Sequence, residues 1–304
     1  MQERSNVSST TSPVAARSEA GLVGDHLRYR VSEAAGKTVL YVLLVGLSLL
    51  FLFPLFWMIS TSLKTNPEVA TMPPTWLPAI PQWNNYPGAL EFAPLVKFAG
   101  NTLFICAVNV IGTVISCSMI AYGFARIRWP GRDSVFIMVL ATMMIPGQVT
   151  MIPIYNIFTR LGWVNTFLPL TVPSFFGAAF YIFMLRQFFM TIPFELSEAA
   201  VIDGSSEFNI YSTIILPLAK PALATVALFT YLGHWNDFLG PLIYLSDPEK
   251  YTLSIGLRYF QTLTWSEFPM QMAAATMMTL PIIVLFFFTQ RTFIQGIALT
   301  GLKG

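Results

Sequence analysis

Charged side chains are scarce in this sequence. Asp, Glu, Lys and Arg make up 11% of its 304 residues, whereas soluble domains carry about 25%. Hydrophobic residues make up 55%, and the mean hydropathy is +0.62. This composition is typical of an integral membrane protein. The net charge of +2 is too small to indicate a nucleic-acid partner.

Cysteine and histidine are also scarce. Cys106 and Cys117 fall in one predicted helix, where eleven residues rise roughly 16 Å, and a disulfide needs Cα atoms within about 7 Å. We therefore expect two buried free thiols. With only His26 and His234 in the sequence, there is no HExxH motif and no metal-spaced Cys/His cluster. A GxxxxGK[ST] phosphate loop is absent too, so the sequence predicts no catalytic site and no cofactor, and any ATP hydrolysis belongs to another chain.

Long apolar segments dominate what is present. Each is long enough to cross about 30 Å of hydrocarbon as a helix, so we predict an all-α polytopic membrane protein with six transmembrane helices. The segments are 38–61, 98–124, 134–158, 166–189, 221–245 and 271–293. Prolines 146, 153, 169 and 173 interrupt the third and fourth segments, where we expect kinks.

The flanking sequence predicts the remaining organisation. Residues 1–37 are rich in Ser and Thr and read as a disordered tail, residues 38–294 as the membrane domain, and residues 295–304 as a C-terminal tail. With the N-terminus inside, 12 of the 17 Lys and Arg residues lie on the inner side, including the three arginines of "RIRWPGR", Arg126–Arg132. We therefore expect a multi-pass protein of the cell membrane with both termini in the cytoplasm.

One polar loop, residues 191–220, separates the fourth and fifth segments and lies inside in this topology. We predict a short helix over 191–205, a left-handed stop at Gly204 and a second helix capped by Ser205. The loop holds four acids and has no basic residue between Arg186 and Lys220. An amphipathic connection on anionic lipid should instead be basic, so the charge favours docking to a protein with a basic groove.

The spacing within this loop is specific. The pattern EAA, three residues, G, nine residues, I, one residue, LP matches Glu198–Ala200, Gly204, Ile214 and Leu216–Pro217. It resembles the EAA loop of the membrane subunits of ABC importers. The chain from about residue 38 to 304 resembles the smaller permease subunit of carbohydrate importers of the maltose-transporter type. The supporting segments are "AYGFARIRWPGR" (121–132), "WNDFLGPL" (235–242), "YTLSIGLRYF" (251–260) and "GLKG" (301–304).

This resemblance implies the type I ABC importer (MetI-like) transmembrane fold. It implies a heterodimer with a second permease subunit, two ATPase subunits and an external solute-binding protein. The EAA helix would be a coupling helix that docks on an ATPase. By position, Glu198 would pair with a basic residue there, Ala199 and Ala200 would allow close approach, Gly204 would make the corner, and Asp203 is a weaker candidate.

Polar residues in the fifth segment form a second candidate site. A charge at this depth costs about 2.5–3.5 kcal/mol on insertion scales, so Asp237 should face the bundle interior, a partner or water. The alternatives are a path for a hydroxyl-rich solute and a structural hydrogen-bond lock between helices. The candidate pathway residues are Gln148, Tyr181, Trp235, Asn236 and Asp237, although aromatic residues in membrane helices more often serve packing.

The outer segment 247–269 is a third candidate. Long loops on one side are often simple caps, but the resemblance implies that this one faces the binding protein. The candidate contacts are Tyr251, Tyr259, Phe260 and Trp265. The function favoured by these features is a carbohydrate-import permease subunit. The alternatives are an ion-coupled secondary transporter that uses Asp237 and a membrane scaffold.

Overall fold

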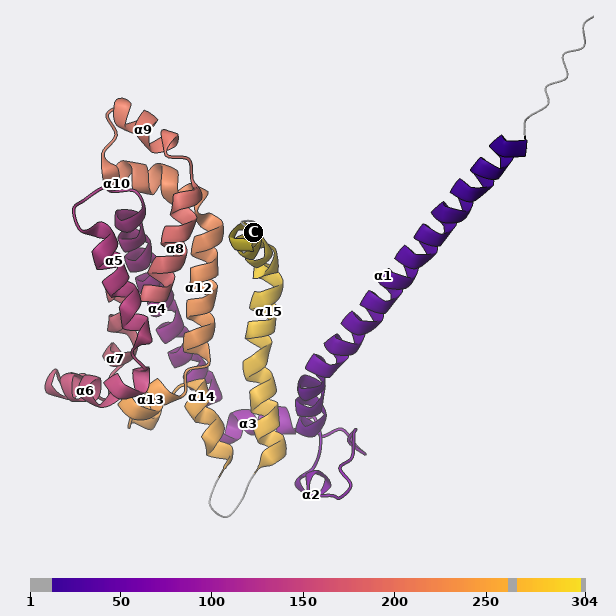
Figure 1. Cartoon of the computed structure of the whole chain (residues 1–304). Coiled ribbons are helices and arrows are strands. Elements are labelled where there is room, and N and C mark those ends of the chain that lie inside the picture. The colour runs from indigo at the N-terminus through magenta and orange to yellow at the C-terminus, as the bar shows by residue number, and fades with distance from the viewer. Residues whose placement is uncertain (1–12, 262–266, 302–304) are drawn as a thin grey trace, which may run out of the picture. The chain divides into compact units, whose positions relative to one another are not determined.

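The computed structural model describes residues 13–261 and 267–301, and within these ranges it is built from helices without a strand (Figure 1). The chain divides into two compact units, residues 1–57 and 58–304. The first unit is occupied by most of one long helix, and the second holds every other helix. The predicted all-α class is confirmed.

The helices have the following bounds. They are α1 (Pro13–Ser62), α2 (Asn66–Val69), α3 (Asn85–Phe92), α4 (Leu95–Ala125), α5 (Arg132–Ala141), α6 (Gly147–Arg160), α7 (Leu168–Thr171), α8 (Ala179–Thr191), α9 (Glu195–Ile202), α10 (Glu207–Ile210), α11 (Leu216–Leu218), α12 (Lys220–Trp235), α13 (Leu239–Tyr244), α14 (Leu253–Gly256) and α15 (Phe268–Gly301). Five short η helices lie between them, among them η2 (Val172–Phe176) and the π-helical η3 (Tyr211–Ile215).

Four stretches in the described residues are helical, long and apolar enough to cross a membrane, namely 36–62, 95–125, 168–191 and 268–290. Two bent pairs raise the number to six if each pair is one span. These pairs are α5 with α6, bent by 96°, and the segment 207–218 with α12, bent by 79°.

Proline explains the sharpest bend. The chain leaves the helical region at Ile145 and Pro146, before α6 begins at Gly147, because proline disfavours helical geometry in the residue before it. Pro153 lies inside α6, and Pro169 and Pro173 occupy first-turn positions of α7 and η2, where the missing N–H costs nothing. The predicted continuous segment 134–158 is therefore two helices.

Three predicted boundaries differ from the structure. The segment 221–245 is helical only to Trp235, and a turn then leads into α13. Helix α1 begins at Pro13, inside the predicted irregular tail 1–37, since residues 14–53 hold no proline to stop a helix. Helix α15 continues through most of the predicted tail 295–304. Residues 1–12 and 302–304 of the two tails lie outside the described residues.

The core of the second unit forms around α4, which packs against α8, α12 and η2. Leu185, Phe189, Ile215 and Val226 are fully buried there. Cys106 and Cys117 are buried and free, as the sequence predicted. Helices α9 and α10 lie at one end of this packed group, and α6, α13 and α14 lie toward the other (Figure 1).

Candidate functional site

The EAA loop, residues 191–220, is a helix, a glycine corner and a second helix. Helix α9 ends in a Schellman motif, in which Gly204 N–H bonds to Val201 O (3.0 Å) and Ser205 N–H to Ala200 O (2.9 Å). Gly204 has φ +81°, so the predicted left-handed stop is confirmed. The second helix begins one residue later than predicted, because the Oγ of Ser206, and not of Ser205, accepts the hydrogen bond of Asn209 N (3.3 Å).

Helix α9 presents an acidic and apolar face to its surroundings. Glu198, Ala199 and Asp203 are exposed, and the Ile202 side chain is 85% exposed. Ala200 instead is buried in the core of the second unit. The two EAA alanines therefore differ in exposure, and close approach to a partner stays a prediction for Ala199 alone.

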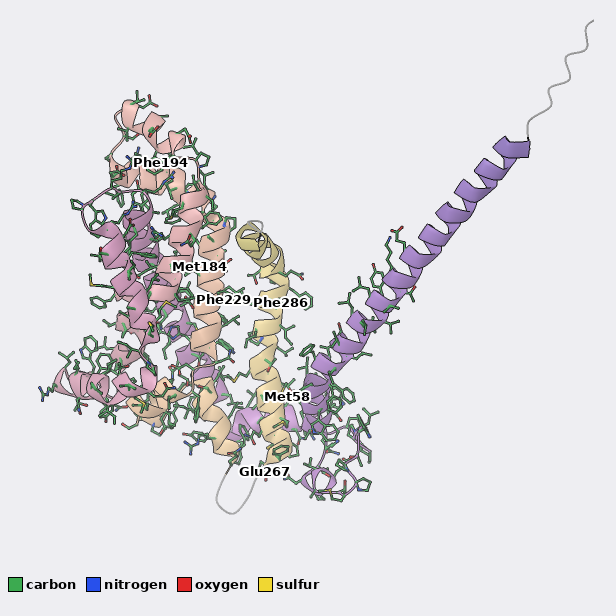
Figure 2. All side chains as sticks on the ribbon, viewed as in Figure 1. Met58, Met184, Phe194, Phe229, Glu267 and Phe286 are labelled. Carbon is green, nitrogen blue, oxygen red and sulfur yellow. The ribbon has the colours of Figure 1, made fainter. Side chains whose placement is uncertain are left out.

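Arg126 ties the start of this loop to the end of α4. Its side chain is only 6% exposed, and its guanidinium donates to Ile192 O (2.9 Å), Pro193 O (3.0 Å) and Ser197 Oγ (3.1 Å). The guanidinium carbon also lies 4.7 Å from the centre of the Phe194 ring, which Figure 2 labels next to α9. Burial lowers the pKa of Arg126, but an arginine stays charged at physiological pH. The permanent charge of Arg126 therefore holds the carbonyl groups of Ile192 and Pro193 in place just before α9.

A second connection joins α4 to the other half of the loop. Tyr122 Oη donates to Glu207 Oε2 (2.6 Å), and Ser118 Oγ shares a hydrogen bond with Tyr211 Oη (2.7 Å). The rings of Tyr122 and Tyr211 pack with centroids 5.3 Å apart. With Arg126, these contacts fix both helices of the loop to one face of α4.

A cavity of about 440 Å³ lies among α4, the α7–η2 segment, α8, α12 and the turn after α12. Its polar lining includes Asn109, Thr113, Tyr181, Thr230, His234 and Asp237. Hydroxyl, amide, imidazole and carboxylate groups from four parts of the chain therefore converge in one hollow. Such a lining can hydrogen-bond a hydroxyl-rich solute. Of the predicted pathway residues, Tyr181 and Asp237 are brought together here.

Asp237 is also a structural residue. It lies in the turn between α12 and α13, and its Oδ1 accepts the hydrogen bond of Gly240 N (3.1 Å) in the first turn of α13. Its backbone carbonyl accepts a hydrogen bond from Ser254 Oγ. A Cβ atom at Gly240 would lie 2.5 Å from Asp237 Oδ2, so glycine leaves room for the carboxylate. The structure therefore gives Asp237 a capping role as well as a place in the cavity wall.

The other three predicted pathway residues lie elsewhere. Trp235 is buried, stacks on Tyr231 (centroids 5.4 Å apart) and donates from its indole to Met278 O (3.2 Å), so it joins α12 to α15. Asn236 and Gln148 are exposed, and neither lines the cavity. Whether a residue lines the cavity depends on its position around the helix rather than on its polarity, because neighbouring residues of a helix point in different directions.

The predicted binding-protein contacts also separate. Phe260 is fully buried and stacks on Phe92, with ring centroids 5.2 Å apart. It holds the outer segment together, and an external partner cannot reach it in this structure. Trp265 lies outside the described residues.

Tyr251 and Tyr259 are half-buried, and together with the exposed Arg258 they line a hollow of about 370 Å³. The outer segment is fixed to the start of α4 by an ion pair between Lys97 and Glu249. Tyr251, Arg258 and Tyr259 therefore present a surface that an external partner can reach, whereas Phe260 does not.

Some residues of both sites were not singled out from the sequence. In the sequence, Arg126 served as an orientation signal, and Tyr122 appeared only within the segment 121–132 that supports the resemblance. Only the fold reveals their contacts with the EAA loop. Asn109, whose amide donates to Leu170 O (2.8 Å), lies inside an apolar segment. A polar residue at that depth is itself a signal of function or helix contact. His234 carried the same signal.

Comparison with known proteins identifies the family and the fold of the chain. Residues 112–298 match the family described as "Binding-protein-dependent transport system inner membrane component". The arabinooligosaccharides transport system permease protein AraQ of Bacillus subtilis is 31% identical over 285 residues, covering 91% of this chain and 100% of that protein. The diacetylchitobiose uptake system permease protein DasC of Streptomyces coelicolor is 28% identical, covering 86% and 94%.

The fold also has a solved relative. A chain of a bacterial ABC transporter involved in the import of the acidic polysaccharide alginate superposes with a TM-score of 0.76 at 25% identity, covering 86% of this chain and 97% of that one. The resemblance to ABC importer permeases and the MetI-like fold are confirmed. The chain therefore belongs to the family of binding-protein-dependent transport system inner membrane components.

Proposed function

We propose that this chain is a permease subunit of an ATP-driven importer and forms part of the path for a carbohydrate. The family match supports the transport role, and the relatives named for arabinooligosaccharides and diacetylchitobiose support the carbohydrate. The single observation that carries the proposal is the EAA loop, whose exposed acidic helix ends in a rigid glycine corner and is fixed to α4.

The loop transmits movement from a separate ATPase subunit. The exposed Glu198 and Ile202 would meet the ATPase with one charged and one apolar contact. Displacement of α9 then moves α12 through the chain itself. It also moves α4 through Arg126 and the Tyr122–Glu207 hydrogen bond. Because α4 and α12 both line the 440 Å³ cavity, one movement alters two of its walls.

The remaining assembly follows the same proposal. A second permease subunit faces the cavity side, an external binding protein delivers the solute to the outer segment around Tyr251 and Tyr259, and the EAA loop and both termini lie in the cytoplasm. The cavity's hydroxyl and amide groups exchange hydrogen bonds with the solute's hydroxyls as it crosses. The chain itself carries no hydrolytic step.

The test is co-purification with the ATPase subunit encoded for the same transporter. The variant Glu198→Lys places a positive charge against the proposed basic groove, so we expect the ATPase to be lost while membrane insertion is unchanged. Glu91→Lys makes the same change on an exposed residue of α3 and should retain the ATPase. Retention by Glu198→Lys at the control level would overturn the coupling role.

A further inference from the structure

A basic pocket lies at the link between α4 and α5. It has a volume of about 290 Å³ and is lined by Arg128, Trp129, Gly131, Arg132, Asp133 and Ser134. Helix α4 and the pair α5–α6 are candidate membrane spans on either side of it. The link therefore lies where the apolar part of the chain ends, at the end of the second unit that carries the EAA loop.

The charge of this pocket is positive and only partly compensated. Asp133 Oδ1 is shared between Arg132 (3.2 Å) and Arg186 (3.5 Å), so two guanidinium groups already surround its one carboxylate. Arg128 is exposed, and in the described part of the chain it makes no hydrogen bond or ion pair, although it lies 5.6 Å from the Phe194 ring centre. In the lining, two arginines against one aspartate leave an excess of one positive charge, and Arg186 adds a further cation next to Asp133.

The surroundings fit a lipid better than a soluble anion. The Trp129 ring packs near Phe124, with centroids 5.8 Å apart, and its indole N–H donates to Gly123 O (3.3 Å). Tryptophan at the end of a membrane helix is typical of the interface with headgroups. On α5, Ile137 and Met138 are 65% and 61% exposed, which provides apolar surface next to the pocket for acyl chains.

We propose that this pocket binds the phosphate-bearing headgroup of an anionic phospholipid. Arg128 and Arg132 supply fork-shaped donors that match phosphate oxygens, and the Ser134 hydroxyl supplies a further donor. Basic pockets between membrane helices are suited to anionic headgroups. The site lies next to Phe194 of the EAA loop, so a bound headgroup and the loop share the Arg128 side chain as a neighbour.

The test uses the full-length protein in detergent and native mass spectrometry with added phosphatidylglycerol or phosphatidylcholine. We expect phosphatidylglycerol to be retained in preference, and Arg128→Gln to weaken its retention roughly fivefold to tenfold. Because Arg128 makes no hydrogen bond within the described residues, this variant should fold normally. Arg160→Gln, which removes an exposed arginine at the end of α6, is the matched control and should change nothing.

Three results would each overturn the proposal. They are equal retention of the two lipids, loss of phosphatidylglycerol from the Arg160→Gln control to the same degree, and full displacement of the lipid by inorganic phosphate, which would identify a site for free anions. Arg128→Lys keeps the charge without the fork, so retention between that of the parent and of Arg128→Gln is the supporting result.

Discussion

Gly204 shapes the EAA loop through its backbone conformation, and Arg126 shapes it through side-chain hydrogen bonds. Gly204 is exposed, and nothing lies within 4 Å of the position its Cβ would take, so its backbone conformation alone requires glycine. Arg126 is buried and matters through the carbonyl groups that it collects. One residue sets the direction of the chain, and the other holds the loop against α4.

Gly204→Val should abolish most transport while Gly204→Asn retains much of it. A β-branched residue in the left-handed region is costly, whereas asparagine tolerates it, and the general penalty is roughly 1–2 kcal/mol. The measurement is solute uptake normalised to the amount of inserted protein. Since both side chains have open space around them, equal uptake by the two variants would contradict the role of the backbone angle.

Arg126→Gln should loosen the EAA loop without unfolding the membrane helices. Leaving buried acceptors without a donor costs about 1–3 kcal/mol, and the loss falls on Ile192, Pro193 and Ser197. We expect faster protease cleavage in the loop and lower uptake. Arg126→Lys should lie between the parent and Arg126→Gln, because lysine keeps the charge but not the planar fork. Cleavage unchanged in both variants would rule out the clamp.

At the scale of elements, α4 is the helix on which both sites meet. Its C-terminal end holds the EAA loop through Tyr122 and Arg126, and its middle supplies Asn109 to the wall of the 440 Å³ cavity. Helix α12 connects the same two sites through the chain, but with a 79° bend from the segment before it. Helix α4 is far from the EAA loop in the sequence, but its side chains contact the loop directly.

The Tyr122–Glu207 hydrogen bond can be tested by a double-mutant cycle. Tyr122→Phe and Glu207→Ala should each reduce uptake, and the double variant should be little worse than either, because each single change removes the same hydrogen bond. A charge-assisted hydrogen bond of this kind contributes about 1.5–3 kcal/mol. Effects that simply add in the cycle would show that the two residues act separately.

The capping role of Asp237 can be tested separately from the role of its charge. Asp237→Ser keeps an acceptor for Gly240 N–H and removes the charge, whereas Asp237→Ala removes both. If capping dominates, Ser should keep near-normal thermal stability and Ala should lose about 1 kcal/mol. Normal stability but abolished uptake in the Ser variant would assign the charge to the transport path.

Uptake that follows an ion gradient without ATP would support the secondary-transporter alternative.

At the scale of the whole molecule, the proposed topology places the EAA loop and the outer segments on opposite sides of the membrane. The excess of Lys and Arg on the predicted inner side is the basis for this orientation. The native thiols Cys106 and Cys117 are buried. Added cysteines can therefore be labelled over a low background.

Phe208→Cys should react with a membrane-impermeant maleimide only after the cells are opened, because Phe208 is exposed on α10 of the loop assigned to the cytoplasm. Ile80→Cys, also at an exposed position, lies between the predicted spans 38–61 and 98–124, on the side assigned to the outside, and should react on intact cells. The readout is the labelled fraction on a gel before and after permeabilisation. The opposite pattern would invert the topology.

The sequence by itself determined the class, the approximate number of spans and the EAA motif with its glycine corner. These features are local, since apolar length decides whether a helix can span a membrane and glycine spacing decides where one stops. The same reasoning placed Trp235 and Phe260 in functional sites. Both side chains proved buried, because residue type alone does not say which way a helix faces.

Only the tertiary structure decided which distant residues meet. Arg126 finds its partners 66 to 71 positions further along the chain, and Asn109 and Asp237 line one cavity although they lie on separate elements. Polar groups buried in an apolar bundle must find hydrogen-bond partners wherever the packing brings them. Spacing along the chain carries no record of those contacts, so the connection from the EAA loop to α4 becomes visible only in the folded molecule.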